Sequence, residues 1–155
     1  MKIEIPNIND WEVNNNLAIQ VHELHVSWRP DLFISVNEVI TQKELKEMIE
    51  NKEIFVAKIN NDIVGYITFI IKEKVNQNPK FRHRKQLNIE AMCIDSKHRG
   101  KGIGTKLLNF IKEEAIRNNC TDIYLTVNEE NENAIKIYEK FGMKVKNISY
   151  SMKID

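Results

Sequence analysis

The segment that decides the fold lies at residues 99–105 and reads Arg99-Gly100-Lys101-Gly102-Ile103-Gly104-Thr105. It follows the apolar run at 87–94, a predicted strand, and it opens an amphipathic helical pattern over 100–118. Glycines without a Cβ atom let a ligand approach the main chain. Free N–H groups at a helix start, together with the helix dipole, favour anions. The pattern therefore predicts a phosphate-binding loop, to which Arg99 and Lys101 add positive charge.

The residue order excludes two other phosphate loops. A Walker A loop needs Gly-Lys-Ser/Thr after its spacer, whereas the order here is Gly104-Thr105-Lys106. The dinucleotide fingerprint needs a glycine three positions after its second glycine, and Thr105 occupies that position. A glycine-rich turn that serves packing alone remains an open alternative.

Alternating strand and helix patterns precede this loop. We expect a short strand at 2–5, a helix over 11–26 and a second helix that Thr41 caps and that continues to about 51, with Glu44 completing a capping box. The β-rich runs 54–59 and 63–71 flank Asn60-Asn61-Asp62, residues that tolerate positive φ. Those two runs are therefore predicted to form an antiparallel hairpin.

The elements after the loop continue the alternation. We expect a strand at 122–127, a helix over 132–141, and one broken strand or two over 143–154. A strand joined to the next through a helix is usually parallel to it. The order therefore predicts one α/β (α+β) domain over residues 1–155, with a mixed sheet and helices on both faces.

Composition limits the partners and the compartment. The 155 residues are 42% apolar and 29% charged, and the formal net charge is +1, so composition indicates neither a nucleic acid nor a membrane partner. The chain has no apolar run of ~18 residues and no apolar stretch typical of a signal peptide near Met1. We expect a cytoplasmic protein with Cys93 and Cys120 reduced. The basic stretch 74–85 could steer an acidic substrate or touch RNA, but a solvated loop is the favoured interpretation.

Two spaced motifs resemble the GNAT (GCN5-related N-acetyltransferase) family. Residues 99–104 resemble its acetyl-CoA loop, Arg/Gln-x-x-Gly-x-Gly/Ala, and residues 131–143 are similar to its Asn-x-x-Ala-x-x-x-Tyr-(x)3-Gly-Phe, with Met143 replacing Phe. Residues 89–95 look like its fourth strand, and 24–33 resemble a segment between the first two helices in one branch. The resemblance implies a mixed, mostly antiparallel sheet of six to seven strands, splayed between the fourth and fifth.

The resemblance also implies acetyl-CoA as cosubstrate and no metal. The pantetheine arm would pair with the backbone of Met92, Cys93 and Ile94, and the pyrophosphate would bind the main chain of Arg99, Gly100, Lys101, Gly102, Ile103, Gly104 and Thr105. Asn131 matches the residue that contacts the cofactor arm, although it is also suited to cap the 132–141 helix. His22 and His25 are three positions apart, but no third metal ligand suggests itself.

Two residues are candidates for acid–base catalysis. Glu90 is the expected base that takes a proton from the amine, unless it faces solvent or pairs with a cation. Tyr138 is the expected acid for the departing CoA thiolate and a contact of the cofactor, unless it merely packs on the sheet. Cys93 could act as a covalent nucleophile, but no residue is placed by sequence to activate it. His25, Trp28, Arg29 and Phe33 are the expected acceptor-binding residues; ordinary packing between helices is the alternative.

The sequence therefore predicts an acetyl-CoA-dependent N-acetyltransferase that acts by direct transfer to a primary amine. The acceptor is either a small molecule or a protein or peptide, since fold and cofactor do not set the substrate. A CoA-binding regulatory domain without turnover is the alternative. The chain is expected to be a monomer or homodimer.

Overall fold

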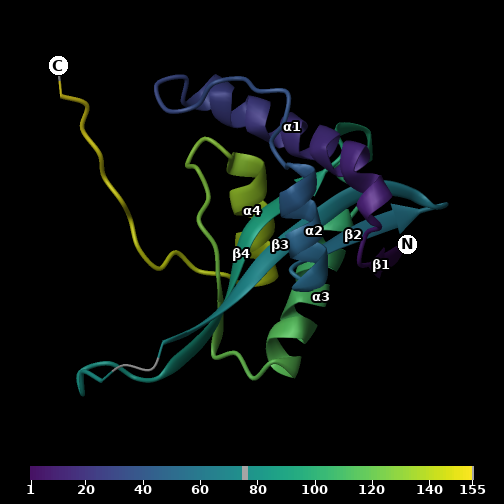
Figure 1. The fold of residues 1–155 in the computed structure, drawn as a ribbon. Coiled ribbons are helices and arrows are strands. Elements are labelled where there is room, and N and C mark those ends of the chain that lie inside the picture. The colour runs from purple at the N-terminus through teal and green to yellow at the C-terminus, as the bar shows by residue number, and fades with distance from the viewer. Residues whose placement is uncertain (75–76, 155) are drawn as a thin grey trace.

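A computed structural model describes residues 1–74 and 77–154 and contains one mixed β-sheet (Figure 1). Its strands are β1 (Lys2–Glu4), β2 (Ile54–Ile59), β3 (Asp62–Lys74), β4 (Arg84–Ile94) and β5 (Asp122–Tyr124). They lie side by side in chain order. The first four pair antiparallel, and β5 pairs parallel to β4. The predicted mixed, mostly antiparallel sheet is thus confirmed.

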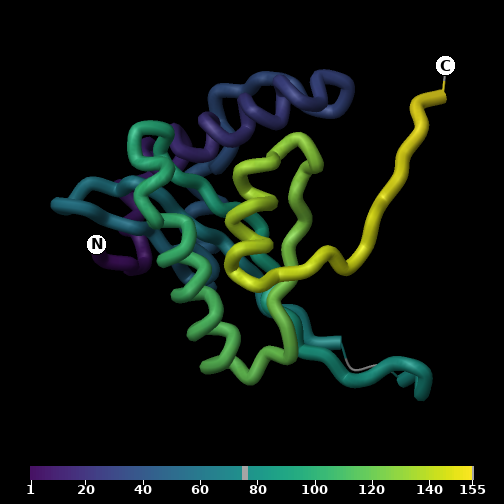
Figure 2. Tube along the Cα trace, turned by 180° about the vertical axis from the view of Figure 1, so that it is seen from behind, coloured from purple at the N-terminus to yellow at the C-terminus, as the bar shows by residue number. Residues whose placement is uncertain are grey.

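Two helices cover each face of the sheet (Figures 1 and 2). The helices α1 (Trp11–Trp28) and α2 (Gln42–Glu50) pack on one face, and α3 (Ile103–Arg117) and α4 (Glu132–Phe141) on the other. The first face has a core that includes Leu17, Leu45 and Tyr66. The second has a larger core that includes Leu87 and Leu107. Short 3-10 turns, η1 (Ile8–Asp10) and η2 (Ser96–His98), precede α1 and α3.

Two local predictions, the helix cap at Thr41 and the turn at Asn60-Asn61, are confirmed. The hydroxyl of Thr41 accepts a hydrogen bond from the Glu44 amide at 3.1 Å, and the Glu44 carboxylate accepts one from the Thr41 amide at 2.8 Å. This reciprocal capping box starts α2. Asn60 and Asn61 have φ of 51° and 69°, the left-handed conformation that asparagine tolerates. The β2–β3 hairpin is therefore confirmed together with its turn residues.

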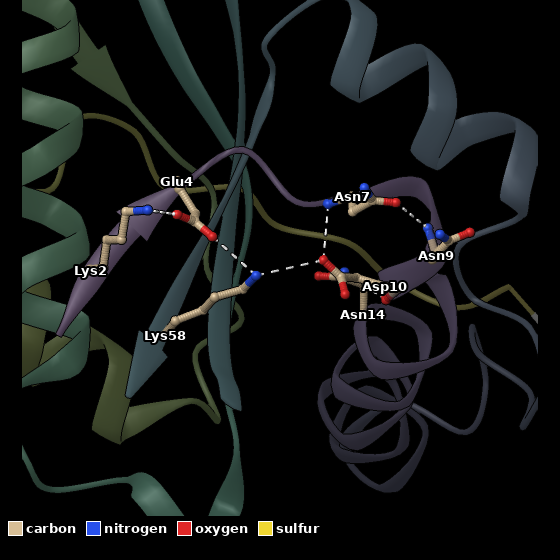
Figure 3. Close-up of polar contacts among 7 residues, drawn as sticks. All are labelled: Lys2, Glu4, Asn7, Asn9, Asp10, Asn14 and Lys58. Carbon is tan, nitrogen blue, oxygen red and sulfur yellow. Dashed lines mark hydrogen bonds and ion pairs between the residues drawn. The ribbon is translucent and has the colours of Figure 1, made fainter. Parts of the chain in front are cut away.

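A polar cluster fastens the first strand to the start of α1 (Figure 3). The Lys58 ammonium on β2 lies 3.0 Å from the Glu4 carboxylate and 3.8 Å from that of Asp10. Asp10 also accepts hydrogen bonds of 2.9 Å from the Asn7 amide and, at its carbonyl, from the Asn14 side chain. The hydrogen bond from Lys2, and then that from Lys58, lower the pKa of Glu4. The cluster thus joins two strands and a helix through one lysine.

The C-terminal part of the sheet prediction is wrong. Residues 144–154 form no strand, and β5 ends at Tyr124 where the expected strand continued to Val127, so the described residues contain five strands and not six or seven. The alternating apolar pattern favours an extended chain, but a strand also needs a neighbour to accept its backbone hydrogen bonds. No described strand lies beside residues 144–154.

The sheet is tightest where β3 meets β4. A Cβ atom added at Gly65 would lie 2.7 Å from the Cys93 carbonyl oxygen and 2.9 Å from Ile94 Cδ1. The neighbouring β4 backbone cannot give way without breaking the strand pairing, in which Gly65 lies opposite Ile94. Gly65 therefore permits a close approach that fixes the position of β4.

Gly65→Ala should lower the free energy of unfolding by about 1–3 kcal/mol, the usual cost of overpacking a core. Gly104→Ala is the matched control, because its new Cβ would meet Met92 Cε at 3.7 Å and Ile137 Cδ1 at 3.9 Å, ordinary contacts. Alanine is also the better helix former, so this control should be neutral or stabilising. Urea denaturation followed by circular dichroism measures both. Equal stability of Gly65→Ala and wild type would refute the close approach.

Candidate active site

The site begins where β4 and β5 separate. Their parallel pairing ends at Asn88 opposite Tyr124, and no described strand pairs with that side of β4 from Ile89 to Ile94. Residues 125–127 continue the chain outside the sheet, which explains why β5 is shorter than expected. The backbone groups of Met92, Cys93 and Ile94 on that side therefore have no partner strand and can bind an extended ligand.

A β-bulge decides which way Glu90 points. Thr68 pairs with Ala91 but Phe69 pairs with Ile89, so Glu90 is the extra residue in β4. Before the bulge, Ile89 faces the α3–α4 core; after it, Ala91 and Cys93 face the α1–α2 core. Since side chains alternate along a strand, the bulge leaves Glu90 on the α1–α2 face. Its side chain is exposed there.

The glycine loop at the end of β4 forms an open cradle of main-chain groups. Gly100 and Gly102 have φ of 74° and 76°, and no heavy atom lies within 4 Å of the Cβ position of either. No side chain caps the first turn of α3, whose first backbone hydrogen bond runs from the Lys106 amide to the Gly102 carbonyl at 3.1 Å. The amides that precede Lys106 are left to bind an anion such as a pyrophosphate.

Basic side chains stabilise the loop from within. Arg99 Nε donates to the Ile94 carbonyl, and Lys101 Nζ donates to the Lys97 carbonyl, each at 3.1 Å. Both side chains are exposed, and both belong to the loop itself. The groups that are available to an anion are therefore main-chain amides, with the basic residues Arg99 and Lys101 in the same loop.

A contact between distant residues, which sequence analysis missed, holds this loop against α1. Gln20 Nε2 donates to Asp95 Oδ1 at 3.1 Å, and the Ser96 amide donates to Gln20 Oε1 at 2.9 Å. His98 Nδ1 lies 2.7 Å from Asp95 Oδ2. The hydrogen bond to His98, and then that to Gln20, lower the pKa of Asp95. Gln20 thus acts as a positioning residue for the chain that leads into the cradle.

Helix α4 closes the site on the side opposite Glu90. The Cβ position of Gly104 lies 3.7 Å from Met92 Cε and 3.9 Å from Ile137 Cδ1, so the start of α3, the open strand β4 and α4 meet here. Tyr138 follows Ile137 and packs, half-buried, against the same core. Burial, and then the nearby Cys93 thiolate charge, raise the pKa of Tyr138 to about 12. The phenol therefore stays protonated at neutral pH and can donate that proton.

Cys93 is unsuited to covalent catalysis. Its side chain is 2% exposed in the α1–α2 core. Burial raises the pKa of the Cys93 thiol to about 12, although a hydrogen bond with Tyr66 opposes the rise. The thiolate is the reactive form of cysteine, and it is scarce at neutral pH with such a pKa. Both cysteines are free in the structure.

Three of the four expected acceptor-binding residues lie together at the end of α1. The His25 ring centroid is 5.5 Å from those of Trp28 and Phe33. Burial, and then the neighbouring His22, lower the pKa of His25, which favours the neutral imidazole. Arg29 instead forms a bidentate pair with Asp31 at 2.9 and 2.7 Å. The described residues contain no group of three His, Cys, Asp or Glu side chains that could hold a metal.

Two asparagines have distinct hydrogen-bonding environments, one at the start of α4 and one where β4 and β5 separate. The Asn131 side chain accepts a hydrogen bond from the Ala134 amide at 3.3 Å and so caps α4, as expected. Asn88 was not predicted as a site residue, because it interrupts an otherwise apolar strand without any motif. It is 8% exposed, and its Oδ1 has no hydrogen-bond partner among the described residues. It therefore places an unsatisfied acceptor at the point where the strands separate.

The unpaired side of β4 and the free main-chain amides at the end of that strand suit a ligand that carries a phosphate group and an extended amide arm. The chain belongs to the acetyltransferase (GNAT) family, whose model matches residues 18–143. Among the described residues, no helix has the length and apolar character to span a membrane.

Similar proteins support the same class. The chain is 28% identical over 145 residues to the spermine/spermidine N(1)-acetyltransferase of Bacillus subtilis, covering 93% of this chain and 89% of that protein. It is 32% identical over 117 residues to N-alpha-acetyltransferase 50 of Danio rerio, covering 71% and 66%. The crystal structure of a mutant BH1408 protein from Bacillus halodurans has a TM-score of 0.94 at 24% identity, with 99% of both chains covered.

Proposed function

We propose that this acetyltransferase uses acetyl-CoA and acts by direct transfer of the acetyl group to a primary amine. The observation that carries the proposal is the main-chain cradle at Gly100 and Gly102, which lies at the end of the strand whose other side is unpaired. The diphosphate of CoA needs an anion site such as this cradle. The extended amide arm attached to the diphosphate needs an unpaired strand edge next to that site. Family membership supports the same cosubstrate.

Main-chain groups would do most of the binding. The residues proposed to hold the pyrophosphate are Arg99, Gly100, Lys101, Gly102, Ile103, Gly104 and Thr105. The backbone of Met92, Cys93 and Ile94 would pair with the pantetheine arm, and a backbone N–H there would stabilise negative charge on the reacting carbonyl oxygen. Asn131 would contact the arm through its amide N–H while its oxygen caps α4. Acetyl-CoA supplies the activated acetyl group.

Glu90 is the proposed general base. A free alkylamine resembles the lysine side chain, whose reference pKa is ~10.4, and is therefore mostly protonated at neutral pH. A carboxylate must accept that proton, directly or through water, before the amine can attack. The bulge in β4 keeps Glu90 on the α1–α2 face, exposed to an incoming acceptor.

Tyr138 is the proposed general acid. Its half-buried phenol lies with Met92 against the core that borders the cradle. A pKa raised to about 12 keeps its proton available for the departing thiolate over the whole physiological range. Tyr138 thus holds the proton that a general acid must donate at neutral pH.

The acceptor is proposed to be a primary amine that enters near His25, whose ring packs against those of Trp28 and Phe33. The names of the similar proteins include both spermine or spermidine and an N-alpha amine as acceptors. Spermidine, an amino acid and a peptide N-terminus therefore form the first acceptor panel. If the protein binds CoA but releases no thiol with any acceptor in this panel, the alternative of a CoA-binding regulatory domain without turnover is favoured.

Isothermal titration calorimetry with CoA tests the cradle. We expect Gln20→Leu to weaken CoA binding roughly tenfold, because two hydrogen bonds that hold the preceding loop are lost. Gln42→Leu, at an exposed position on α2, should bind as the wild type does. If well-folded wild-type protein shows no affinity for CoA, the proposed function is wrong.

Tyr138→Phe should lower kcat about 100-fold or more while changing the KM for acetyl-CoA little, because only the donated proton is removed. Steady-state thiol release over the acceptor panel measures this effect. Tyr150→Phe is the matched control, since that side chain is exposed on the C-terminal segment. Wild-type turnover in Tyr138→Phe would exclude this tyrosine as the acid.

Glu90→Gln should remove the fall in kcat/KM on the acidic side of the pH–rate profile and lower the maximum. The amide keeps the size of the side chain but cannot accept the proton. Glu129→Gln, an exposed change in the loop before α4, provides the control. An unchanged acidic limb in Glu90→Gln would assign the base to another group.

A further inference from the structure

The β3–β4 hairpin ends in a basic ribbon, residues 72–74 and 77–85, that extends beyond the rest of the sheet. Among the described strands, β2 pairs with β3 only as far as Thr68, and β5 pairs with β4 only from Gln86 onward. The pairs beyond these positions therefore join β3 and β4 alone. Both views show the hairpin projecting past the helices that cover the sheet (Figures 1 and 2).

A β-turn over residues 78–81 orders the end of this ribbon. The Phe81 amide donates a hydrogen bond to the Asn78 carbonyl at 3.1 Å, and the Lys80 amide donates one to the Asn78 side chain at 3.0 Å. Pro79 occupies the second position of the turn, where its fixed φ is favoured. Lys80 is exposed, and Phe81 is 62% exposed. The tip thus displays a cation beside an aromatic ring.

Positive charge is concentrated in the ribbon. Residues 72–85 contain six lysines and arginines and one acid, whereas acids outnumber basic residues in the rest of the chain. The net charge of +1 is therefore an average over a basic ribbon and an acidic body. Such charge asymmetry within one chain is typical of proteins that bind a polyanion.

The chain itself neutralises little of this charge. The one acid, Glu73, has its carboxylate 3.1 Å from His83 Nε2, and Arg84 pairs with Asp122 at 2.5 Å. Four of the cations are exposed and form no ion pair with a carboxylate among residues 1–74 and 77–154. They are Lys72, Lys74, Lys80 and Arg82.

The strand pairing places like charges on one face of the ribbon. Ile71 and its partner Leu87 pack in the α3–α4 core. Since side chains alternate along a strand, Lys72, Lys74 and Arg84 share the opposite face. Lys74 also lies directly opposite Arg84, and a like-charge pair in this position is destabilising. A bound polyanion would remove that repulsion.

We propose that the basic ribbon binds nucleic acid through its phosphate backbone, at a site separate from the acetyl-transfer site. Cations that neutralise phosphates release counterions, which drives binding without base contacts. A duplex groove admits a two-stranded ribbon, and the exposed Phe81 ring can stack on a base. An acidic protein would match the charge but would provide neither a groove nor a base, so nucleic acid is the favoured partner. The proposal does not depend on the enzymatic activity.

Fluorescence anisotropy of the full chain with a labelled DNA duplex, the matching RNA duplex and one single strand tests the proposal. We expect log Kd to rise with log salt concentration with a slope of about 3 to 4, because four exposed cations each neutralise one phosphate. The probe that binds most tightly distinguishes DNA from RNA. Absence of binding to all three probes at low salt would overturn the proposal.

Neutralising variants locate the site. The quadruple variant Lys72→Gln, Lys74→Gln, Lys80→Gln, Arg82→Gln should weaken binding about tenfold or more and flatten the salt dependence. The control removes the same charge from exposed helix positions and should bind as the wild type does: Lys43→Gln, Lys46→Gln, Lys112→Gln, Lys140→Gln. Circular dichroism checks that both variants are folded.

Three further outcomes would contradict the proposal. Unchanged binding in the ribbon variant would place the site elsewhere, and an equal loss in both variants would show an effect of net charge alone. If polyglutamate binds the ribbon as tightly as the nucleic acids do at the same salt concentration, the partner is an acidic protein. Calorimetry with CoA tests the proposed function separately, so either proposal can fail alone.

Discussion

The separation of β4 from β5 is the constraint on which the rest of the structure depends. The two strands share three residue pairs and then part after Asn88 and Tyr124. The bulge at Glu90 lies immediately beyond that point, and bulges bend a strand and increase its twist. The place where β4 loses its partner β5 is therefore next to the place where the bulge turns the Glu90 carboxylate to the α1–α2 face. The close approach at Gly65 then holds β4 against β3 on its other side.

In the proposed site, each element contributes one kind of group. The start of α3 contributes main-chain donors, α4 contributes the phenol of Tyr138, and the end of α1 contributes a set of aromatic rings. These elements come from distant parts of the chain, so their relative position depends on the two cores on either side of the sheet. Gln20 links the cores to the site directly, because it reaches from α1 to the loop that precedes the cradle.

Features governed by neighbouring residues could be predicted from the sequence. The cap at Thr41, the turn at Asn60 and Asn61 and the bounds of α4 follow from hydrogen bonds and backbone preferences within a few positions. Features governed by strand partners could not. The face of Glu90 depends on a register shift against β3, the Gln20–Asp95 contact spans 75 positions, and residues 144–154 have a strand pattern but no neighbouring strand in their own chain. The apolar–polar pattern of a sequence predicts which side chains tend to be buried, but it does not predict which element packs against them.

The cradle at residues 99–105 also bears on how such a protein diverges. The groups proposed to bind the anion belong to the peptide backbone, which every amino acid supplies, so a substitution at Lys101 or Thr105 would leave the donors in place. Within this loop, only Gly100 and Gly102 have a positive φ, which L-amino acids disfavour. A chain can therefore lose three quarters of its identity with a structural neighbour and still keep the same architecture, as the 24% identity with the BH1408 protein illustrates.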